Sequence, residues 1–332
     1  MSAAPESSTC VVLGAGSWGT ALAIQLARLS RPTVLWGRDP ALARQRSNER
    51  YLPQAEFPDT LRVETNLAAA VRAAPDLLIA VPSHALRSLL QEIAPHLGAD
   101  ARVSWATKGF ELTTGLLPHQ VVRQVLGERV PTAVVSGPTF AKEVGAGLPT
   151  AMTVAASDAT FASDLAQRLS GLNFRAYTSA DMIGVEVGGA IKNVLAIGAG
   201  ISDGLGFGAN TRIALITRGL VEMTRLGVAL GARKETFMGL AGLGDLVLTC
   251  TDNQSRNRRM GLALASGQSA AAAQKAIGQV VEGVQAARAV RDVAARLSVE
   301  MPICEQVYRV VHEGATPKDA VKELFSRALK PE

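Results

Sequence analysis

Apolar and polar positions over the first 180 residues follow a pattern that predicts strands separated by helices. Short apolar runs that end in glycine or polar residues occur at 10–16, 33–37, 76–82, 102–109, 132–138, 151–157 and 174–179. Segments between them, such as 17–30 and 85–97, have apolar residues at helical spacing. Strands that alternate with helices predict a mainly parallel sheet covered on both faces.

Beyond about residue 180 the strand pattern stops, and the remaining segments have helical periodicity. We expect helices at 181–203, 211–230, 255–266, 269–277, 282–297, 302–313 and 317–328. The sequence therefore predicts an α/β domain over residues 1–180 and an all-α domain over residues 181–332.

Composition is that of an ordinary globular chain of about two domains, with 332 residues, 48% of them hydrophobic and 19% charged. The net charge of +5 is not accompanied by a basic run with interleaved aromatic residues. The densest basic cluster, RNRR at 256–259, is compatible with a nucleic-acid patch, but a helix start or an anion site fits it better. We therefore expect a small anionic ligand and no nucleic acid.

Cysteine and histidine spacing excludes several kinds of site. The cysteines, Cys10, Cys250 and Cys304, lie far apart, and the four histidines show no metal-binding spacing. We expect no disulfide framework and no metal, as in a reducing cytosol. The N-terminal MSAAPESST lacks the features of a signal peptide, and no apolar run approaches a membrane span. The chain is therefore predicted to be cytoplasmic, without membrane insertion.

The segment GAGSWG, residues 14–19, has the glycine spacing of a dinucleotide-binding loop. Such glycines often only form turns, but this loop follows a predicted strand and opens a predicted helix. Gly14 permits the tight turn, Gly16 lets the backbone approach a pyrophosphate, and Gly19 lets the helix pack on the strand. The helix N-terminus then binds the phosphates, with Ser17 and Trp18 beside them. We predict a Rossmann-type dinucleotide site.

The end of the second predicted strand indicates which dinucleotide is preferred. An acidic residue there binds the ribose 2′-hydroxyl of NAD, whereas an arginine accommodates the 2′-phosphate of NADP. The chain has Arg38 at this position and Asp39 one residue later. This order favours NADP(H) over NAD(H), unless Arg38 is only a solvated loop charge.

The apolar stretch GVEVGGAIKNVLAIGAG, residues 184–200, contains a lysine, Lys192, in a helix predicted to be buried on most sides. A buried lysine must find a partner or lose its proton. The alternative is that its stem carries the ammonium group to the surface. Because Lys192 lies near the junction of the predicted domains, where ligand sites are common, we consider it a functional candidate.

Two further segments lie at predicted strand ends. In ATKGF, residues 106–110, Lys108 lies at the carboxyl end of a strand, where open α/β sheets bind ligands. In SGPTFAKEV, residues 136–144, Thr139 is expected to cap a helix that begins at Phe140.

Two more segments belong to the predicted helical domain. In AGLGDLVLTC, residues 241–250, Asp245 follows closely spaced glycines that allow the backbone to approach another group. In SRNRR, residues 255–259, Ser255 is expected to be an N-cap, followed by the phosphate donors Arg256 and Asn257.

Together with VVEG at 280–283, these segments closely resemble bacterial NAD(P)-dependent glycerol-3-phosphate dehydrogenase. The resemblance runs in order from residue 11 to about 325. Its most specific part is EVGGAIKNVLAIGAGISDGLGFGANT, which includes Lys192.

The resemblance implies reversible reduction of dihydroxyacetone phosphate to sn-glycerol 3-phosphate, a precursor of membrane phospholipids, by a homodimer. It implies that Lys192 is catalytic. The substrate-binding positions that it implies are Lys108, Gly137, Thr139, Lys192, Asp245, Ser255, Arg256 and Asn257. The cofactor positions that it adds to the loop glycines are Ser17, Trp18, Arg38, Tyr51, Lys108, Ala141, Arg256, Val280 and Glu282. Thr139 stands where serine is common, and it keeps the hydroxyl group.

The chemistry agrees with these assignments. Hydride transfer to a ketone carbon places negative charge on the oxygen, so a cation that can give up a proton should lie beside it. Lys192 meets both needs, and Lys108 or Asn193 could polarise or orient the substrate. Two alternatives remain: a reductase of hydroxy acids that binds a carboxylate through SRNRR, and a dinucleotide sensor without turnover.

Overall fold

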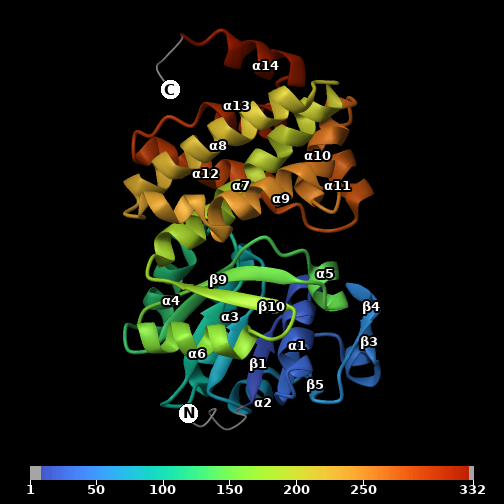
Figure 1. The fold of residues 1–332 in the computed structure, drawn as a ribbon, viewed down its shortest axis with the longest axis vertical. Coiled ribbons are helices and arrows are strands. Elements are labelled where there is room, and N and C mark those ends of the chain that lie inside the picture. The colour runs from blue at the N-terminus through green and yellow to red at the C-terminus, as the bar shows by residue number, and fades with distance from the viewer. Residues whose placement is uncertain (1–8, 329–332) are drawn as a thin grey trace. The chain divides into compact units, whose positions relative to one another are not determined.

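The apolar runs of the N-terminal half, together with the segment Leu61–Glu64, form one eight-stranded sheet in the computed structural model, which describes residues 9–328 (Figure 1). The strands lie in the order β10-β9-β8-β7-β6-β1-β2-β5. They are β1 (Cys10–Leu13), β2 (Thr33–Trp36), β5 (Leu61–Glu64), β6 (Asp76–Ile79), β7 (Arg102–Trp105), β8 (Thr132–Ser136), β9 (Thr150–Ala156) and β10 (Phe174–Ser179). Paired strands are parallel except β8 and β9. The prediction of a mainly parallel sheet is confirmed.

Helices alternate with these strands, as the pattern predicts. They are α1 (Ser17–Arg28), α2 (Leu67–Arg72), α3 (Ser83–Ile93), α4 (Pro118–Leu126), α5 (Ala141–Ala146) and α6 (Ala159–Leu169), with 3-10 turns η1 (Pro40–Arg44) and η2 (Ala94–His96). Helix α1 packs on β1 and β2, and α6 packs on β9 and β10. The carboxyl ends of β1, β2, β6, β7 and β8 share one edge of the sheet, because these strands are parallel.

A small antiparallel hairpin, β3 (Ser47–Asn48) and β4 (Leu52–Glu56), lies outside the main sheet. Sequence analysis did not predict it, nor the edge strand β5. These segments are short and rich in polar residues, so they have no continuous apolar run. Their positions depend on packing against α1, α2 and α5.

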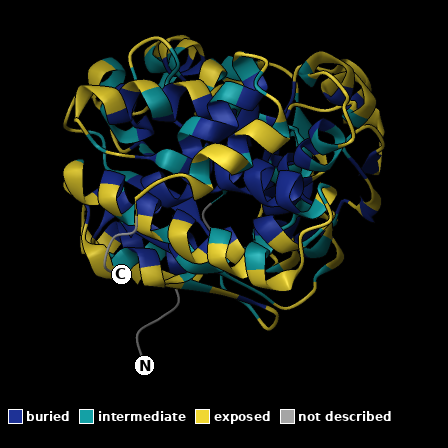
Figure 2. Ribbon diagram, turned by 90° about the horizontal axis from the view of Figure 1, so that it is seen from above, coloured by how far each residue is buried: buried dark blue, intermediate teal, exposed yellow. Residues whose placement is uncertain are grey.

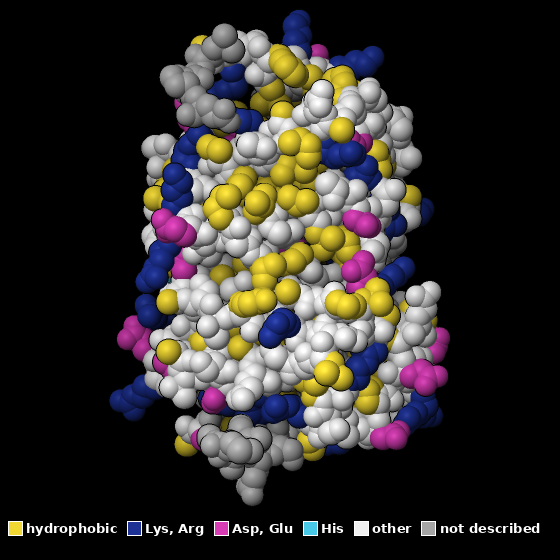
Figure 3. Space-filling model, viewed as in Figure 1, with side chains coloured by type: hydrophobic (Ala, Val, Ile, Leu, Met, Phe, Trp, Pro, Cys, Tyr) yellow, Lys and Arg dark blue, Asp and Glu magenta, His cyan; other side chains and the backbone are white. Residues whose placement is uncertain are grey.

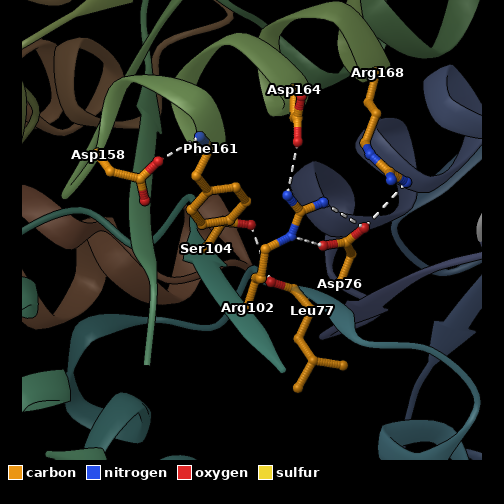
Figure 4. A network of polar contacts seen from close by, with 8 residues as sticks. All are labelled: Asp76, Leu77, Arg102, Ser104, Asp158, Phe161, Asp164 and Arg168. Carbon is orange, nitrogen blue, oxygen red and sulfur yellow. Dashed lines mark hydrogen bonds and ion pairs between the residues drawn. The ribbon is translucent and has the colours of Figure 1, made fainter. Parts of the chain in front are cut away.

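An arginine–aspartate network joins α6 to the amino ends of β6 and β7 (Figure 4). Arg102 donates from Nε to Asp76 Oδ1 at 2.6 Å and from Nη2 to Oδ2 at 3.0 Å. Arg168 Nη1 also lies 3.1 Å from Asp76 Oδ2, and Arg102 Nη1 donates to Asp164 at 2.9 Å. Hydrogen bonding to Asp76 raises the pKa of the Arg102 guanidinium. Open parallel sheets bind ligands at the opposite edge, so we assign this network to stability.

The chain after Met182 is helical. Its helices are α7 (Met182–Gly204), α8 (Ala209–Ala229), α9 (Asp245–Thr251), α10 (Arg256–Ala265), α11 (Ala270–Ile277), α12 (Glu282–Arg296), α13 (Pro302–His312) and α14 (Pro317–Phe325). A 3-10 turn, η3 (Lys234–Met238), and a π turn, η4 (Leu240–Gly244), precede α9. The expected helices are confirmed, whereas the η3–α9 segment was not predicted as helical.

Packing divides the described chain into two units. Unit 1 extends to Lys108 and resumes over Pro118–Met182, and unit 2 comprises Gly109–Leu117 and the chain from Ile183 onward. The segment Gly109–Leu117 therefore packs with the helical residues, although it lies inside the 1–180 range of the predicted first domain. One contact that holds it there runs from Arg296 Nη1 to the carbonyl oxygen of Thr114, at 2.8 Å.

Helix α7 is the core helix of unit 2. Residues 184–202 of this helix are all buried. Figure 2 shows dark-blue buried turns inside the protein and yellow exposed turns outside. The helix is long and apolar enough to cross a membrane, contrary to the expectation from the sequence. However, 89% of its most apolar 18-residue stretch is buried inside the protein. Its apolarity is that of a helix surrounded by other helices.

A buried carboxyl group, Glu222 on α8, ties this helix to the first turn of α13. Its side chain is 3% exposed and accepts hydrogen bonds from the N–H groups of Ile303 at 2.7 Å and Cys304 at 3.2 Å. Burial raises the pKa of Glu222 from its ordinary 4.5 to about 7, against the opposing effect of the two N–H groups.

This shift predicts a pH-dependent contribution to stability. Between the unfolded and folded pKa values the folded protein holds a proton that the unfolded chain has released. The contribution of Glu222 is therefore fully present below about pH 4.5 and is lost as the pH rises through about 7. Within that window the free energy of unfolding of the parent should fall relative to Glu222→Gln, by up to about 1.4 kcal/mol per pH unit. Denaturant unfolding of the parent and of Glu222→Gln at several pH values measures this difference in the free energy of unfolding. A difference that stays constant with pH would refute the prediction.

Candidate active site

The glycine loop joins β1 to α1 with the geometry that the motif predicts. Gly14 has a φ of +122°, and a Cβ there would lie 2.7 Å from the carbonyl oxygen of Ala80. A Cβ on Gly19 would lie 1.9 Å from the carbonyl oxygen of Gly14. Side chains at these two positions would block the turn and the packing of helix on strand.

The N-terminus of α1 is suited to an anion. Gly16 is the N-cap, and among residues 9–328 no side chain caps it and no acidic residue occupies the first turn. Nothing described lies within 4 Å of the point that a Cβ on Gly16 would occupy. Backbone N–H groups at an uncapped helix start bind phosphate groups well. Beside them, Trp18 keeps a buried indole N–H that has no hydrogen-bond partner within the described residues.

Arg38 and Asp39 follow β2 and have different local roles. The carboxylate of Asp39 accepts a hydrogen bond from the Ala41 N–H at 2.9 Å and so caps η1. The side chain of Arg38 is exposed. Because Asp39 already caps a helical turn, Arg38 is the better placed of the two to contact a ligand.

The substrate candidates of unit 1 lie at the ligand-binding edge of the sheet. Lys108 follows β7, and Gly137 follows the neighbouring parallel strand β8. A Cβ on Gly137 would lie 2.9 Å from the Cα of Met152, so only glycine fits there. Ala141 begins α5 in the same connection.

The prediction that Thr139 caps a helix is wrong. Helix α5 begins at Ala141, and its N-cap is Phe140, without a side-chain cap among the described residues. The Thr139 hydroxyl instead donates to the carbonyl oxygen of Gly137 at 3.1 Å. The helix starts one residue later than expected, which moves Thr139 out of the N-cap position.

In unit 2, Lys192 does not extend to the surface. It is 8% exposed, and its Nζ donates a hydrogen bond to the carboxylate of Asp245, which is 1% exposed. The two side chains form a buried ion pair. The alternative that the stem of Lys192 carries its ammonium group to the surface is therefore wrong. From the sequence, Asp245 is expected either to tune this lysine or to hold a substrate hydroxyl, and the structure places the two side chains in contact although 53 positions separate them.

Glycines bring the pair together. A Cβ on Gly188, one turn before Lys192 on α7, would lie 2.3 Å from the carbonyl oxygen of Ala241 in the π turn. A Cβ on Gly242 would lie 2.2 Å from the carbonyl oxygen of Phe237. Glycine at position 188 lets the π turn approach α7, and glycine at position 242 lets the turn close on the end of η3. The turn is followed by Asp245 at the start of α9.

The surroundings of the pair are buried. Cys250 on α9 is fully buried, and burial raises the pKa of its thiol to about 12, although the charge of Lys192 lowers it. Cys250 therefore remains a neutral thiol near pH 7. A buried ion pair in such surroundings interacts more strongly than one at the surface.

The segment Ser255–Asn257 begins α10 beside α7. Ser255 caps the helix as predicted, accepting a hydrogen bond from the Arg258 N–H at 3.2 Å. The amide of Asn257 donates to Asn193 Oδ1 at 2.8 Å, and Asn193 donates to Glu282 at 3.1 Å. These contacts gather residues of α7, α10 and α12 that lie far apart in the sequence.

The basic cluster at 256–259 separates into three environments. Arg258 is buried and pairs with Asp203 at 2.5 Å, so it belongs to the core of unit 2. Arg259 is exposed, and Arg256 is half-buried at the start of α10. This arrangement is unlike a continuous basic surface for nucleic acid.

The remaining candidates are less enclosed. Tyr51 lies in the β3–β4 turn, where its carbonyl oxygen accepts a hydrogen bond from the Ser17 hydroxyl at 2.9 Å. Val280 is 52% exposed just before α12. Within the part of the chain that the structure describes, no group of three or more His, Cys, Asp or Glu side chains could hold a metal ion.

Comparisons with known proteins agree over nearly the whole chain. The family model of the NAD-dependent glycerol-3-phosphate dehydrogenase N-terminus matches residues 9–162, and that of the C-terminus matches residues 181–322. Proteins named glycerol-3-phosphate dehydrogenase, NAD(P)+, from Aeromonas hydrophila and Sodalis glossinidius are 58% and 56% identical, over 97% and 99% of this chain and 98% of each relative. The crystal structure of glycerol-3-phosphate dehydrogenase from Coxiella burnetii is 48% identical, covers 97% of this chain and all of that chain, and superposes with a TM-score of 0.94. The chain therefore belongs to the NAD-dependent glycerol-3-phosphate dehydrogenase family of oxidoreductases.

Proposed function

We propose that this protein catalyses the reversible NAD(P)H-dependent reduction of dihydroxyacetone phosphate to sn-glycerol 3-phosphate, and so supplies glycerophospholipid synthesis. The observation that carries the proposal is the buried pair of Lys192 and Asp245, a proton donor held on a rigid helix. Relatives that are more than half identical over 98% of their own length are named glycerol-3-phosphate dehydrogenase, NAD(P)+, which supports the proposal.

When bound, the nicotinamide would supply a hydride to the ketone carbon, so negative charge would develop on the ketone oxygen. Lys192 donates a hydrogen bond and then a proton to that oxygen, which stabilises the charge as it forms. Asp245 fixes the position of the ammonium group before the substrate arrives. In the reverse direction, Lys192 accepts the proton from the hydroxyl group of glycerol 3-phosphate.

The binding residues are proposals of the same kind. For the substrate they are Lys108, Gly137, Thr139, Lys192, Asp245, Ser255, Arg256 and Asn257. For the dinucleotide they are Gly14, Gly16, Ser17, Trp18, Gly19, Arg38, Tyr51, Lys108, Ala141, Arg256, Val280 and Glu282. The start of α10 supports a phosphate site, because the half-buried guanidinium of Arg256 lies in its first turn and guanidinium groups bind phosphate well.

Absorbance of the reduced cofactor tests this function. The protein should oxidise NADPH with dihydroxyacetone phosphate, and much more slowly with unphosphorylated dihydroxyacetone. Turnover of 2-keto acids without any phosphate requirement would favour the hydroxy-acid reductase instead. Binding of dinucleotide without turnover of any of these ketones would favour the sensor.

We further propose that NADP(H) is the preferred cofactor, through Arg38. The variant Arg38→Asp should lose about ten- to a hundred-fold in NADPH affinity, because a charge-assisted bond to the 2′-phosphate contributes about 1.5–3 kcal/mol. NADH affinity should change little or improve. Arg44→Asp, an exposed site on nearby η1, controls for the change in net charge. Equal losses for both cofactors would show that Arg38 does not recognise the 2′-phosphate.

We also propose that the protein is a cytoplasmic homodimer. Exposed apolar residues of α8 support an interface, since Ile213, Val221 and Val228 are 57%, 39% and 50% exposed. Figure 3 shows hydrophobic side chains gathered on the face of unit 2 where Figure 1 labels α8. Light scattering in solution measures the mass, and a monomer at all concentrations would contradict the dimer.

A further inference from the structure

The β3–β4 hairpin holds a buried asparagine against the glycine loop. Asn48 is 3% exposed, and its Nδ2 donates to the carbonyl oxygen of Ala15 at 2.9 Å and to Thr20 Oγ1 at 2.8 Å. Its Oδ1 accepts a hydrogen bond from the Tyr51 N–H at 3.3 Å. Both polar atoms of the side chain are engaged, which fixes the orientation of the amide group.

The bond to Ala15 sets the direction of a peptide group inside the loop. In a trans peptide the carbonyl oxygen and the N–H of the next residue point in opposite directions, and the described backbone contains no cis peptide bond. Holding the Ala15 carbonyl toward Asn48 therefore turns the Gly16 N–H away from the hairpin. Gly16 is the N-cap residue beside the open start of α1.

The hairpin itself is firmly supported. The Ser17 hydroxyl donates to the carbonyl oxygen of Tyr51 at 2.9 Å, which is a second link between loop and hairpin. On the other side, Leu52 of β4 is 2% exposed and packs against α5, where a Cβ on Gly145 would lie 2.8 Å from its side chain. A buried amide on a supported hairpin can hold the loop peptide in one orientation before any ligand binds.

We propose that Asn48 is a positioning residue for the dinucleotide. It orients the Ala15–Gly16 peptide so that the Gly16 N–H is directed at the pyrophosphate, and it acts through the backbone without touching the cofactor. Orienting the loop in advance removes an ordering cost from cofactor binding. The inference rests on the proposed function, and it adds a residue that the GxGxxG spacing does not reveal.

Three variants test the proposal by cofactor titration of the purified protein, together with kcat, KM and the melting temperature of the cofactor-free form. Asn48→Asp keeps the shape and the acceptor for Tyr51 but removes the donor to Ala15. We expect its Kd for NADPH and for NADH to rise by about tenfold each, because both cofactors share the pyrophosphate. The KM for dihydroxyacetone phosphate at saturating cofactor, and kcat, should stay within about twofold of the parent.

Thr20→Val removes one acceptor of the Asn48 amide without changing side-chain shape, and a smaller rise in both Kd values is expected. Ser47→Ala is the matched control, because Ser47 is also buried in β3. Its hydroxyl donates a hydrogen bond to Glu49, and within the described residues it makes no hydrogen bond to the glycine loop. If Asn48→Asp does not fold, the Kd values of Thr20→Val for NADPH and NADH test the proposal instead.

The outcomes separate the two proposals. Unchanged Kd values in both Asn48→Asp and Thr20→Val, with a parent that binds dinucleotides, would overturn the positioning role and leave the proposed function intact. An equal loss of affinity in Ser47→Ala would also overturn it, since the effect would then come from hairpin stability. A parent that binds neither NADPH nor NADH would overturn the proposed function itself.

Discussion

Replacing Lys192 with methionine is expected to lower kcat for dihydroxyacetone phosphate by at least about a hundred-fold, because general acid catalysis contributes about 10²–10⁴-fold. Methionine keeps the unbranched chain and removes the ammonium group. Cofactor affinity should barely change, since Lys192 is not among the proposed dinucleotide-binding residues and the glycine loop is untouched. Steady-state kinetics and cofactor titration measure both quantities. Near-normal kcat in the folded variant would remove Lys192 from the chemistry.

The same variant should also lose stability. A lysine buried without a partner could be removed at no cost, and on sequence alone we expect stability to be equal or higher. The ion pair reverses that expectation, because Lys192→Met leaves the carboxylate of Asp245, which is 1% exposed, without this cation. Breaking a buried pair by removing one partner typically costs about 3–5 kcal/mol. The double variant Lys192→Met/Asp245→Asn should regain much of this stability but none of the activity. If Lys192→Met is as stable as the parent, the ion pair between Lys192 and Asp245 does not contribute to stability, which would contradict this prediction.

Replacing Arg256 with alanine is expected to lower kcat/KM for dihydroxyacetone phosphate by about ten- to a hundred-fold, mainly through KM. The reason is the loss of a charge-assisted hydrogen bond to phosphate, about 1.5–3 kcal/mol. The preference over unphosphorylated dihydroxyacetone should shrink by a similar factor. Some loss of cofactor affinity is also expected, because Arg256 is proposed to contact both ligands.

The same helix supplies the controls for Arg256. Arg259→Ala removes an exposed charge from α10 and should leave kcat/KM close to that of the parent. Arg258→Ala should instead reduce stability, because Arg258 is buried and paired with Asp203. If Arg256→Ala discriminates between the two ketones as well as the parent does, the phosphate binds elsewhere.

The elements that sequence predicts well are those whose cause is local. The β1–α1–β2 unit follows from an apolar run, a glycine loop and a helical pattern, and the steric roles of Gly14 and Gly19 follow from the close approach of backbone. The Ser255 cap of α10 is local as well. In these places a few neighbouring residues determine the conformation.

Other features depend on contacts between distant segments, so no local pattern reveals them. The partner of Lys192 follows a π turn that fits against α7 because residue 188 is glycine, and that closes on Phe237 because residue 242 is glycine. The β3–β4 hairpin has too few apolar residues to be read as strands, and its buried Asn48 lies outside every motif. The capping role expected for Thr139 is wrong because a shift of one residue at a helix start changes which residue is the N-cap.

The proposed reaction passes a hydride from the nicotinamide to the ketone carbon of dihydroxyacetone phosphate. It is tested most directly with NADPH that carries deuterium at both positions of nicotinamide C4, followed by mass spectrometry and NMR of the product. We expect sn-glycerol 3-phosphate with one deuterium at C2 for each NADPH oxidised. Oxidation of NADPH without deuterium at C2, or no oxidation with this substrate, would contradict it.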